Sequence, residues 1–170
     1  SSIHGSEEDV KEVNLSDYLD GGDKRIIFEK DIVRYWKCWH KNCMPKKIEV
    51  KESLLKFLGW YISEGSLDEV NHCISISQEY TNEKFLSDMK EFELDYGIKC
   101  GKIKGGDEVQ FINPILCRIV KEWCGRYSYG KHLPSFFWKL DKQRQQILIQ
   151  TYLEGDGQFM IPKDCKGESY

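Results

Sequence analysis

The sequence predicts an α+β fold, and three observations support this prediction. Apolar residues recur at helical spacing over residues 51–64 and again over residues 142–153. Between these segments, residues 72–77 and 108–112 alternate apolar with small or polar residues, which is typical of half-buried strands. Glycines follow the expected helices and end them. The chain of 170 residues is long enough for one domain with its own core.

Residues 1–43 are predicted to be an acidic N-terminal arm or linker that carries a small helical element. The first 23 residues hold seven acids and a single base, Lys11. Large apolar residues are spaced through residues 26–40 in a way that favours one helix or a small satellite element. Met44-Pro45 breaks that pattern. The main domain is therefore expected to span residues 44–170.

Within the main domain, helices and strands are expected to alternate in a fixed order. Residues 51–64 form a helix, residues 72–77 a strand, and residues 81–96 a second helix that Gly97 closes. Two strands over residues 99–104 and 108–112 flank Gly105-Gly106-Asp107 and form a hairpin. A third helix opens at Pro114 and ends near Gly125, a basic loop follows, and a final helix covers residues 142–153.

Charge and cysteine content limit the class of protein. The formal net charge is −3, yet the residues after Asp23 carry a net charge of +3, which permits a nucleic-acid partner without demanding one. Residues 1–15 show no signal peptide, and no apolar run approaches the roughly 20 residues of a membrane span. The seven cysteines are expected to be reduced, and the protein is expected to be intracellular and not to associate with a membrane. Cys38, His40 and Cys43 lack the fourth ligand and spacing of a zinc site, so packing is the favoured interpretation.

Two segments resemble each other at the ends of two expected helices. Each has a small residue, an apolar stretch, a second small residue four positions on, then an acid and a glycine. The segments are FLGWYISEG at residues 57–65 and IQTYLEGDG at residues 149–157. The small residues are Gly59 and Ser63 in the first and Thr151 and Gly155 in the second. Because residues four apart share a helix face, the two helices are predicted to pack closely, side by side and parallel.

The final acids of the two segments, Glu64 and Asp156, would then meet. A carboxylate at a helix C-terminus is unfavourable by roughly 0.3–1 kcal/mol, and two neighbouring carboxylates repel. A shared divalent cation relieves both effects, and Mg²⁺ suits a site of carboxylates, waters and phosphate oxygens. The alternative is that each acid and glycine form an ordinary solvated helix stop.

With these residues in place, the two segments resemble the paired motifs of the LAGLIDADG homing endonucleases, in the intein-associated branch. The resemblance covers about residues 44–160 and includes Met44-Pro45-Lys46-Lys47 and Lys131-His132-Leu133-Pro134 before the motifs. It implies an αββαββα half with two motif helices at its core. Only 13 residues follow Gly157, so the second half is expected to be truncated. By resemblance, Glu64 and Asp156 are catalytic and bind Mg²⁺ at the scissile phosphates of duplex DNA.

The resemblance also implies roles for further residues. Gln78, at the end of the 72–77 strand, matches a polar position near the catalytic water. Lys139 and Lys142 are candidates for a lysine that assists the chemistry before the second motif helix. Strand residues that would face the major groove are Ser75, Ser77, Lys102, Lys104, Glu108 and Gln110. Residues that would contact phosphates are Lys99, Arg126 and Lys131. Each of these could equally be an ordinary surface residue.

The expected function is site-specific, Mg²⁺-dependent cleavage of double-stranded DNA by a monomer. A flanking intein splicing domain or host protein is the expected further partner. The alternative is a DNA- or RNA-binding protein on the same scaffold, a maturase or a regulator, that no longer cleaves. The retained acids favour the enzyme, whereas the low net charge and the shortened second half favour the alternative.

Overall fold

The computed structural model of the chain describes residues 9–19, 21–37, 43–79, 81–102, 107–126 and 130–155. The described part is an α+β structure with antiparallel sheets, as the sequence predicted. Its principal sheet has four strands in the order β6-β7-β9-β8. The bounds of these strands are β6 Gly65–Asp68, β7 Cys73–Ser77, β8 Cys100–Lys102 and β9 Glu108–Ile112. The helices are α2 Glu52–Glu64, α3 Glu83–Tyr96, α4 Pro114–Cys124 and α5 Lys142–Gly155.

From α2 to α4 the chain has the order helix, two strands, helix, two strands, helix that the resemblance implied, and β6 is a strand that the residue pattern did not predict. Local capping explains where the helices begin and end. The Asn82 side chain accepts a hydrogen bond from the Phe85 amide at the start of α3, and Gly97 ends that helix at φ 72°. Asn113 caps α4 in the same way, with Pro114 in its first turn. These local signals position both helices against the same sheet.

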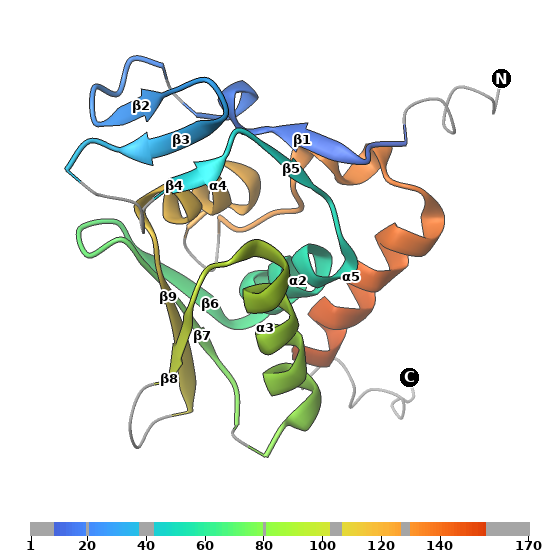
Figure 1. Ribbon diagram of the computed structural model, residues 1–170. Helices are drawn as coiled ribbons and strands as arrows, with labels where there is room; N and C mark the ends of the chain where they lie inside the picture. Colours follow the sequence, from blue (N-terminus) through green and yellow to red (C-terminus); the bar gives the residue numbers. More distant parts are fainter. Residues whose placement is uncertain are drawn as a thin grey trace, which may run out of the picture.

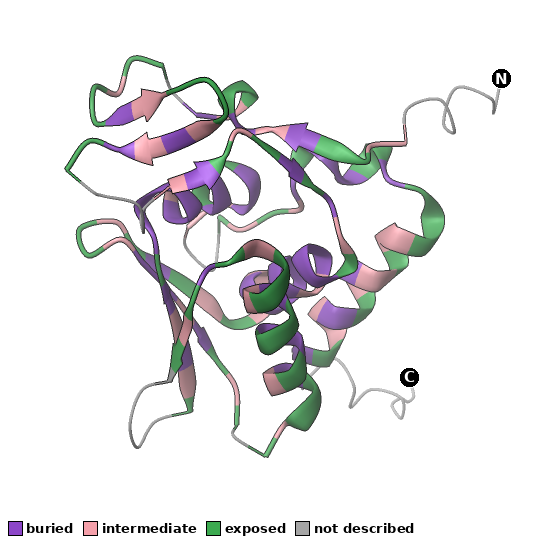
Figure 2. Cartoon of the chain, viewed as in Figure 1, coloured by how far each residue is buried: buried purple, intermediate pink, exposed green. Residues whose placement is uncertain are grey.

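Helix α2 lies at the centre of the molecule, between the sheet, α3 and α5 (Figure 1). Its buried side chains are large, and Trp60 and Tyr61 are fully covered. Figure 2 shows α2 almost wholly buried, whereas α5 carries exposed and half-buried residues along much of its length. Stacked and edge-on aromatic pairs, among them Phe57 with Phe92 and with Phe111, join α2 to α3 and to β9. The core therefore forms around the first of the two motif helices.

Of the two expectations for residues 26–40, the helix was wrong, and the described residues form a small satellite element made of strands. Ile26–Phe28 (β2) and Ile32–Tyr35 (β3) are antiparallel strands, and β3 also pairs with Cys43–Pro45 (β4). The two strands hold four β-branched residues at buried or half-buried positions, Ile26, Ile27, Ile32 and Val33, and such residues favour extended backbone. The remaining residues of that prediction, 38–40, lie outside the described part, as does most of the weighed Cys38–His40–Cys43 group.

The N-terminal segment is packed onto the rest of the molecule. Strand β1, Glu12–Asn14, pairs with β5, Lys47–Glu49. Val13, Leu15 and Leu19 are buried in the common core. Residues 9–19 therefore contribute to the domain, and the predicted boundary at residue 43 falls within β4. Among the described residues, no helix is long and apolar enough to cross a membrane.

Candidate active site

Helices α2 and α5 touch where the two sequence segments carry small residues. A side-chain carbon placed on Gly59 would lie 2.8 Å from the Thr151 Cβ and 2.8 Å from the Leu148 carbonyl oxygen. One turn further on, a carbon placed on Gly155 would lie 2.7 Å from the Ser63 Cβ. Because residue numbers rise together along both helices, the helices are parallel. The predicted close packing of the two motif helices is confirmed.

The seam formed by these four residues, Gly59, Ser63, Thr151 and Gly155, ends where the candidate acids begin. Glu64 is the last residue of α2, and it is exposed. Asp156 follows Gly155 directly but lies outside the described residues. The Ser63 hydroxyl oxygen is buried at this end and has no hydrogen-bond partner among the described residues. The structure thus brings the residue before each acid into contact.

Lys131 lies at the same end of α2, which the sequence did not predict. Its ammonium donates hydrogen bonds to the carbonyl oxygens of Tyr61, at 3.1 Å, and Gly65. It also lies 4.9 Å from the centre of the Tyr61 ring. The C-terminal carbonyls of a helix carry partial negative charge, so they favour a cation here. Burial lowers the pKa of Lys131 below its ordinary value, while the charge of nearby Glu64 acts in the opposite direction.

The backbone around α4 explains how Lys131 reaches this place. Gly125 ends α4 at φ 83°, a left-handed conformation that suits glycine. A side chain at Gly125 would collide with the Gly130 carbonyl, so the chain folds back tightly against the helix end. The Tyr61 hydroxyl donates a hydrogen bond of 2.6 Å to the Gly125 carbonyl and fixes this turn against α2. These glycines are the sequence signal that could have located Lys131.

A second group of charged residues borders the seam from α3. Lys84 Nζ lies 3.1 Å from Asp88 Oδ2 and 3.0 Å from Glu154 Oε1. Asp88 Oδ2 also accepts a 2.9 Å hydrogen bond from the indole nitrogen of Trp60. Burial acts to lower the pKa of Lys84, but its hydrogen bonds to Glu154 and Asp88 outweigh burial and raise that pKa. Sequence spacing gave no signal for this group, because its members come from three helices.

The other predicted catalytic residues fall in two different places. Gln78 follows β7, and because Ile76 pairs with Gly65, this strand end runs beside the end of α2. The Gln78 side chain is half-buried and accepts a 3.2 Å hydrogen bond from Asn82. Lys142 begins α5, so it lies roughly 20 Å along the helix from Gly155. Lys139 is exposed just before that helix. The structure does not bring either lysine to Glu64.

The predicted DNA-facing residues only partly share one sheet face. Ser75 pairs with Gln110, whose amide donates a 3.4 Å hydrogen bond to the Ser75 hydroxyl, and Ser77 pairs with Glu108 on the same face. Lys102 pairs with Val109 in the sheet, and its side chain lies outside the described part of the structure. Lys104 lies outside the described residues.

The predicted phosphate contacts lie apart from one another. Lys99 is exposed and immediately precedes β8, which is an edge strand of the sheet. Arg126 forms a 2.7 Å ion pair with Glu69 beyond the end of β6. Lys131 is held at the end of α2 as described above.

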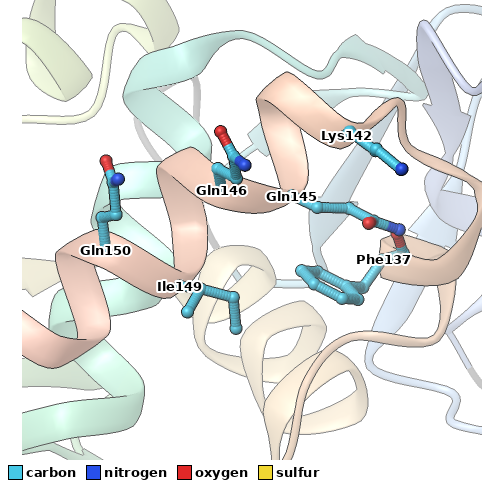
Figure 3. A pocket seen from close by; sticks show the side chains of 6 residues that line it. All are labelled: Phe137, Lys142, Gln145, Gln146, Ile149 and Gln150. Atoms are coloured by element: carbon cyan, nitrogen blue, oxygen red, sulfur yellow. The ribbon is translucent and has the colours of Figure 1, made fainter.

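Two other features were candidates for a functional site: a cluster of metal-binding side chains and a pocket on α5. No group of three or more His, Cys, Asp or Glu side chains gathers within the described ranges, which exclude Asp156. A pocket of about 540 Å³ opens on the outer side of α5 (Figure 3). Its lining residues are Phe137, Lys142, Gln145, Gln146, Ile149 and Gln150. This pocket includes none of the seam residues and carries no carboxylate.

Comparison with known proteins gives distant similarities. No protein-family model matches the chain. The chain is 26% identical over 147 residues to the DNA polymerase II large subunit of Thermococcus kodakarensis. It is 27% identical over 133 residues to a DNA polymerase of the same organism. It is also 25% identical over 125 residues to an uncharacterized protein of Methanocaldococcus jannaschii.

These alignments cover most of the chain but little of the relatives. They include 78%, 74% and 67% of the chain, and 8%, 8% and 14% of the respective relatives. A DNA polymerase of Thermococcus aggregans shows the same pattern, with 25% identity over 85% of the chain and 8% of the relative. The chain is therefore similar to a short segment within proteins named as DNA polymerases.

Proposed function

We propose that the chain is a LAGLIDADG-type homing endonuclease domain that cleaves duplex DNA at a specific site. Glu64 and Asp156 act as its paired metal-binding acids. The observation that carries this proposal is the parallel seam between α2 and α5. Its last contact joins Ser63 to Gly155, and an acid directly follows each of these residues.

The order of elements and the comparisons support the same proposal. The order from α2 to α4 is that of an αββαββα half, and α5 follows as the second motif helix. Similar segments occur in two differently named proteins of one organism, and each occupies 8% of its relative. An element inserted into host proteins would give this distribution. An intein-associated endonuclease is such an element.

The residues at the end of the seam suit a hard divalent cation such as Mg²⁺. Such ions prefer carboxylate oxygens together with waters and phosphate oxygens. Glu64 is exposed at the end of α2, and Asp156 would be the second protein ligand. When bound, the cation supplies positive charge to the scissile phosphate and promotes ionisation of a water.

The chain's own residues complete the proposed site. The ammonium group of Lys131 lies near Glu64, where its positive charge would offset negative charge on the phosphate oxygens. Gln78 lies at the strand end next to α2, where its amide would orient the attacking water. The paired Ser75 and Gln110 side chains lie on the outer face of the sheet and offer hydrogen-bonding groups to base edges.

The test uses the full chain and a DNA duplex that spans the position where its coding sequence is inserted. We expect Mg²⁺-dependent cleavage at one position, which EDTA abolishes. Glu64→Gln or Asp156→Asn should each abolish cleavage while DNA binding stays nearly unchanged. Glu52→Gln is the matched control, because Glu52 is an exposed acid at the opposite end of α2. It should cleave like the wild type.

A thermal melt with Mg²⁺ and with EDTA adds a readout that does not require the DNA target. Mg²⁺ should raise the melting temperature of the wild type by mass action and leave that of Asp156→Asn unchanged. Specific DNA or RNA binding without cleavage would favour the alternative of a maturase or regulator. The formal net charge of −3 is the observation that keeps this alternative in the test. Absence of both nucleic-acid binding and a Mg²⁺ shift would overturn both functions.

A further inference from the structure

Lys84 joins α3 to the last turn of α5. From its place near the start of α3, its ammonium contacts Asp88 on its own helix and Glu154 on α5, at 3.1 and 3.0 Å. Figure 1 shows the C-terminal end of α5 beside the N-terminal end of α3. Glu154 immediately precedes Gly155, the last small residue of the seam. The lysine therefore acts on the part of α5 that leads into Asp156.

The Asp88 end of this bridge is rigidly held. The Asp88 side chain is 6% exposed, and its Oδ2 accepts a 2.9 Å hydrogen bond from the indole nitrogen of Trp60. Trp60 is fully buried in α2 and packs edge-on against Phe85, with ring centres 5.1 Å apart. A buried carboxylate needs hydrogen bonds and cations, and Lys56 Nζ on α2 also lies 3.8 Å from Asp88 Oδ1. Asp88 thus fixes the Lys84 ammonium with respect to α2.

The same tryptophan touches the end of α5. A carbon placed on Gly155 would lie 3.1 Å from Trp60 Cε3. Gly155 is thus confined by Trp60 and Ser63 on its α2 side, while Glu154 is drawn toward α3 by Lys84. The last turn of α5 is therefore held from two directions.

We propose that the Lys84–Glu154 ion pair is a positioning device that orients the last turn of α5 and with it the acid that follows. This inference rests on the proposed function, since it assigns the pair to the geometry of the Glu64 and Asp156 site. Lys84 and Glu154 are positioning residues, because they act through the backbone of α5 and not on the phosphate.

Because the Lys84–Glu154 pair is partly exposed, its effect on positioning can be measured separately from its effect on fold stability. The side chains of Lys84 and Glu154 are 47% and 43% exposed, and ion pairs at such exposure add little to stability. Loss of the Glu154 carboxylate should therefore leave the melting temperature nearly unchanged. Small displacements of catalytic groups nevertheless reduce rates strongly. A defect in cleavage without a defect in stability is the expected signature.

The experiment compares Glu154→Gln with Glu91→Gln in the full chain. Glu91 is 51% exposed and pairs with Lys56 at 3.9 Å, so it is a matched acid that joins α3 to α2 but does not touch α5. Hydrogen–deuterium exchange of the last-turn amides of α5 is measured first, followed by kcat and KM on the cognate duplex with Mg²⁺. Lys84→Met and Lys84→Arg are added to remove and to retain the cation.

We expect Glu154→Gln and Lys84→Met to speed exchange in the last turn of α5 and to lower kcat about tenfold with KM unchanged. Glu91→Gln should match the wild type, and Lys84→Arg should restore most of the activity. Glu154→Gln keeps the Lys84–Asp88 contact, so it stays informative if Lys84→Met fails to fold.

Unchanged exchange at the end of α5 in Glu154→Gln would overturn the positioning device, whatever the activity. Faster exchange with an unchanged kcat would overturn it as well. Faster exchange in a protein whose wild type cleaves no DNA would instead overturn the proposed function and the catalytic purpose of the pair. It would leave the anchoring of α5 by Lys84 established.

Discussion

At the scale of single residues, Lys131 has the environment most unlike that of an ordinary surface lysine. It is half-buried against the carbonyls that end α2, and burial lowers its pKa while Glu64 partly restores it. The protonated form is therefore lost at a lower pH than for a free lysine. A step that needs this cation should lose rate as pH rises through the lowered pKa.

We predict that Lys131→Met lowers cleavage about 100-fold, because a preorganised cation beside the phosphate is lost. Lys131→Arg should retain most of the rate, because guanidinium stays protonated. The alkaline limb of the kcat/KM profile should then move to higher pH. The pH–rate profiles of the three proteins check this. An alkaline limb that Lys131→Arg leaves in place would assign it to another group.

Two buried thiols offer a second test at this scale. Burial raises the pKa of the Cys117 thiol to about 12, and it also raises the pKa of Cys124 above its ordinary value. Because the thiolate is the reactive form, both should resist alkylation in the folded protein at pH 8. Iodoacetamide labelling with mass spectrometry, with and without guanidinium, checks this. Rapid labelling of either thiol in native buffer would contradict the packed core around α4.

At the scale of elements, the seam between α2 and α5 decides the architecture. Gly59 and Gly155 admit the facing helix where any larger side chain would collide with it. Overpacking a tight contact usually costs about 1–3 kcal/mol. Alanine also gains roughly 1 kcal/mol over glycine in a helix interior, so the steric term must outweigh this gain.

We therefore predict that Gly59→Ala destabilises the fold by up to about 2 kcal/mol. The added methyl group would approach Thr151 and the Leu148 carbonyl at 2.8 Å. Gly101→Ala is the matched control, since a carbon there would meet its nearest atom, the Gln110 carbonyl oxygen, at 3.8 Å. Urea denaturation of the three proteins checks this. A Gly59→Ala protein as stable as Gly101→Ala would show that the seam is looser than described.

The same scale shows what the sequence could predict. Helices α2 and α5 were predictable because periodicity, small residues and a terminal glycine agree within each segment. The β2–β3 hairpin was missed because its apolar residues also fit helical spacing, although Ile26, Ile27 and Ile32 are β-branched. The Lys84–Glu154 bridge was not predictable, because it directly joins residues 70 positions apart that only the packing of α3 against α5 brings together.

At the scale of the whole molecule, the N-terminal segment belongs to the same folding unit as the candidate site. Arg144 in α5 donates hydrogen bonds to the Val10 carbonyl at 2.6 Å and to the Val50 carbonyl at 3.3 Å, and it pairs with Asp9. Leu15, in the same segment, is fully buried in the core. Hydrogen bonds and an ion pair thus attach the N-terminal segment to the beginning of α5.

We predict that Leu15→Ala lowers the free energy of unfolding by about 2–5 kcal/mol, because it leaves a cavity in the shared core. Leu94→Ala is the matched control, with a leucine that is 74% exposed on α3. It should stay within about 0.5 kcal/mol of the wild type. Denaturation followed by tryptophan fluorescence and by circular dichroism checks this. Two separate transitions would show that the N-terminal segment unfolds independently.

The seam also determines how α5 is aligned along α2. Gly59 faces Thr151 and Ser63 faces Gly155, so the glycine is on α2 at one level and on α5 at the next. If α5 slid one turn along α2, Ser63 would meet Thr151 and Gly59 would meet a different turn. Ser63 would then clash with Thr151, whereas a slide of one turn in the opposite direction would place Gly59 against Gly155 and leave a void. This alternation selects a single alignment of two similar helices, and it does so by shape alone.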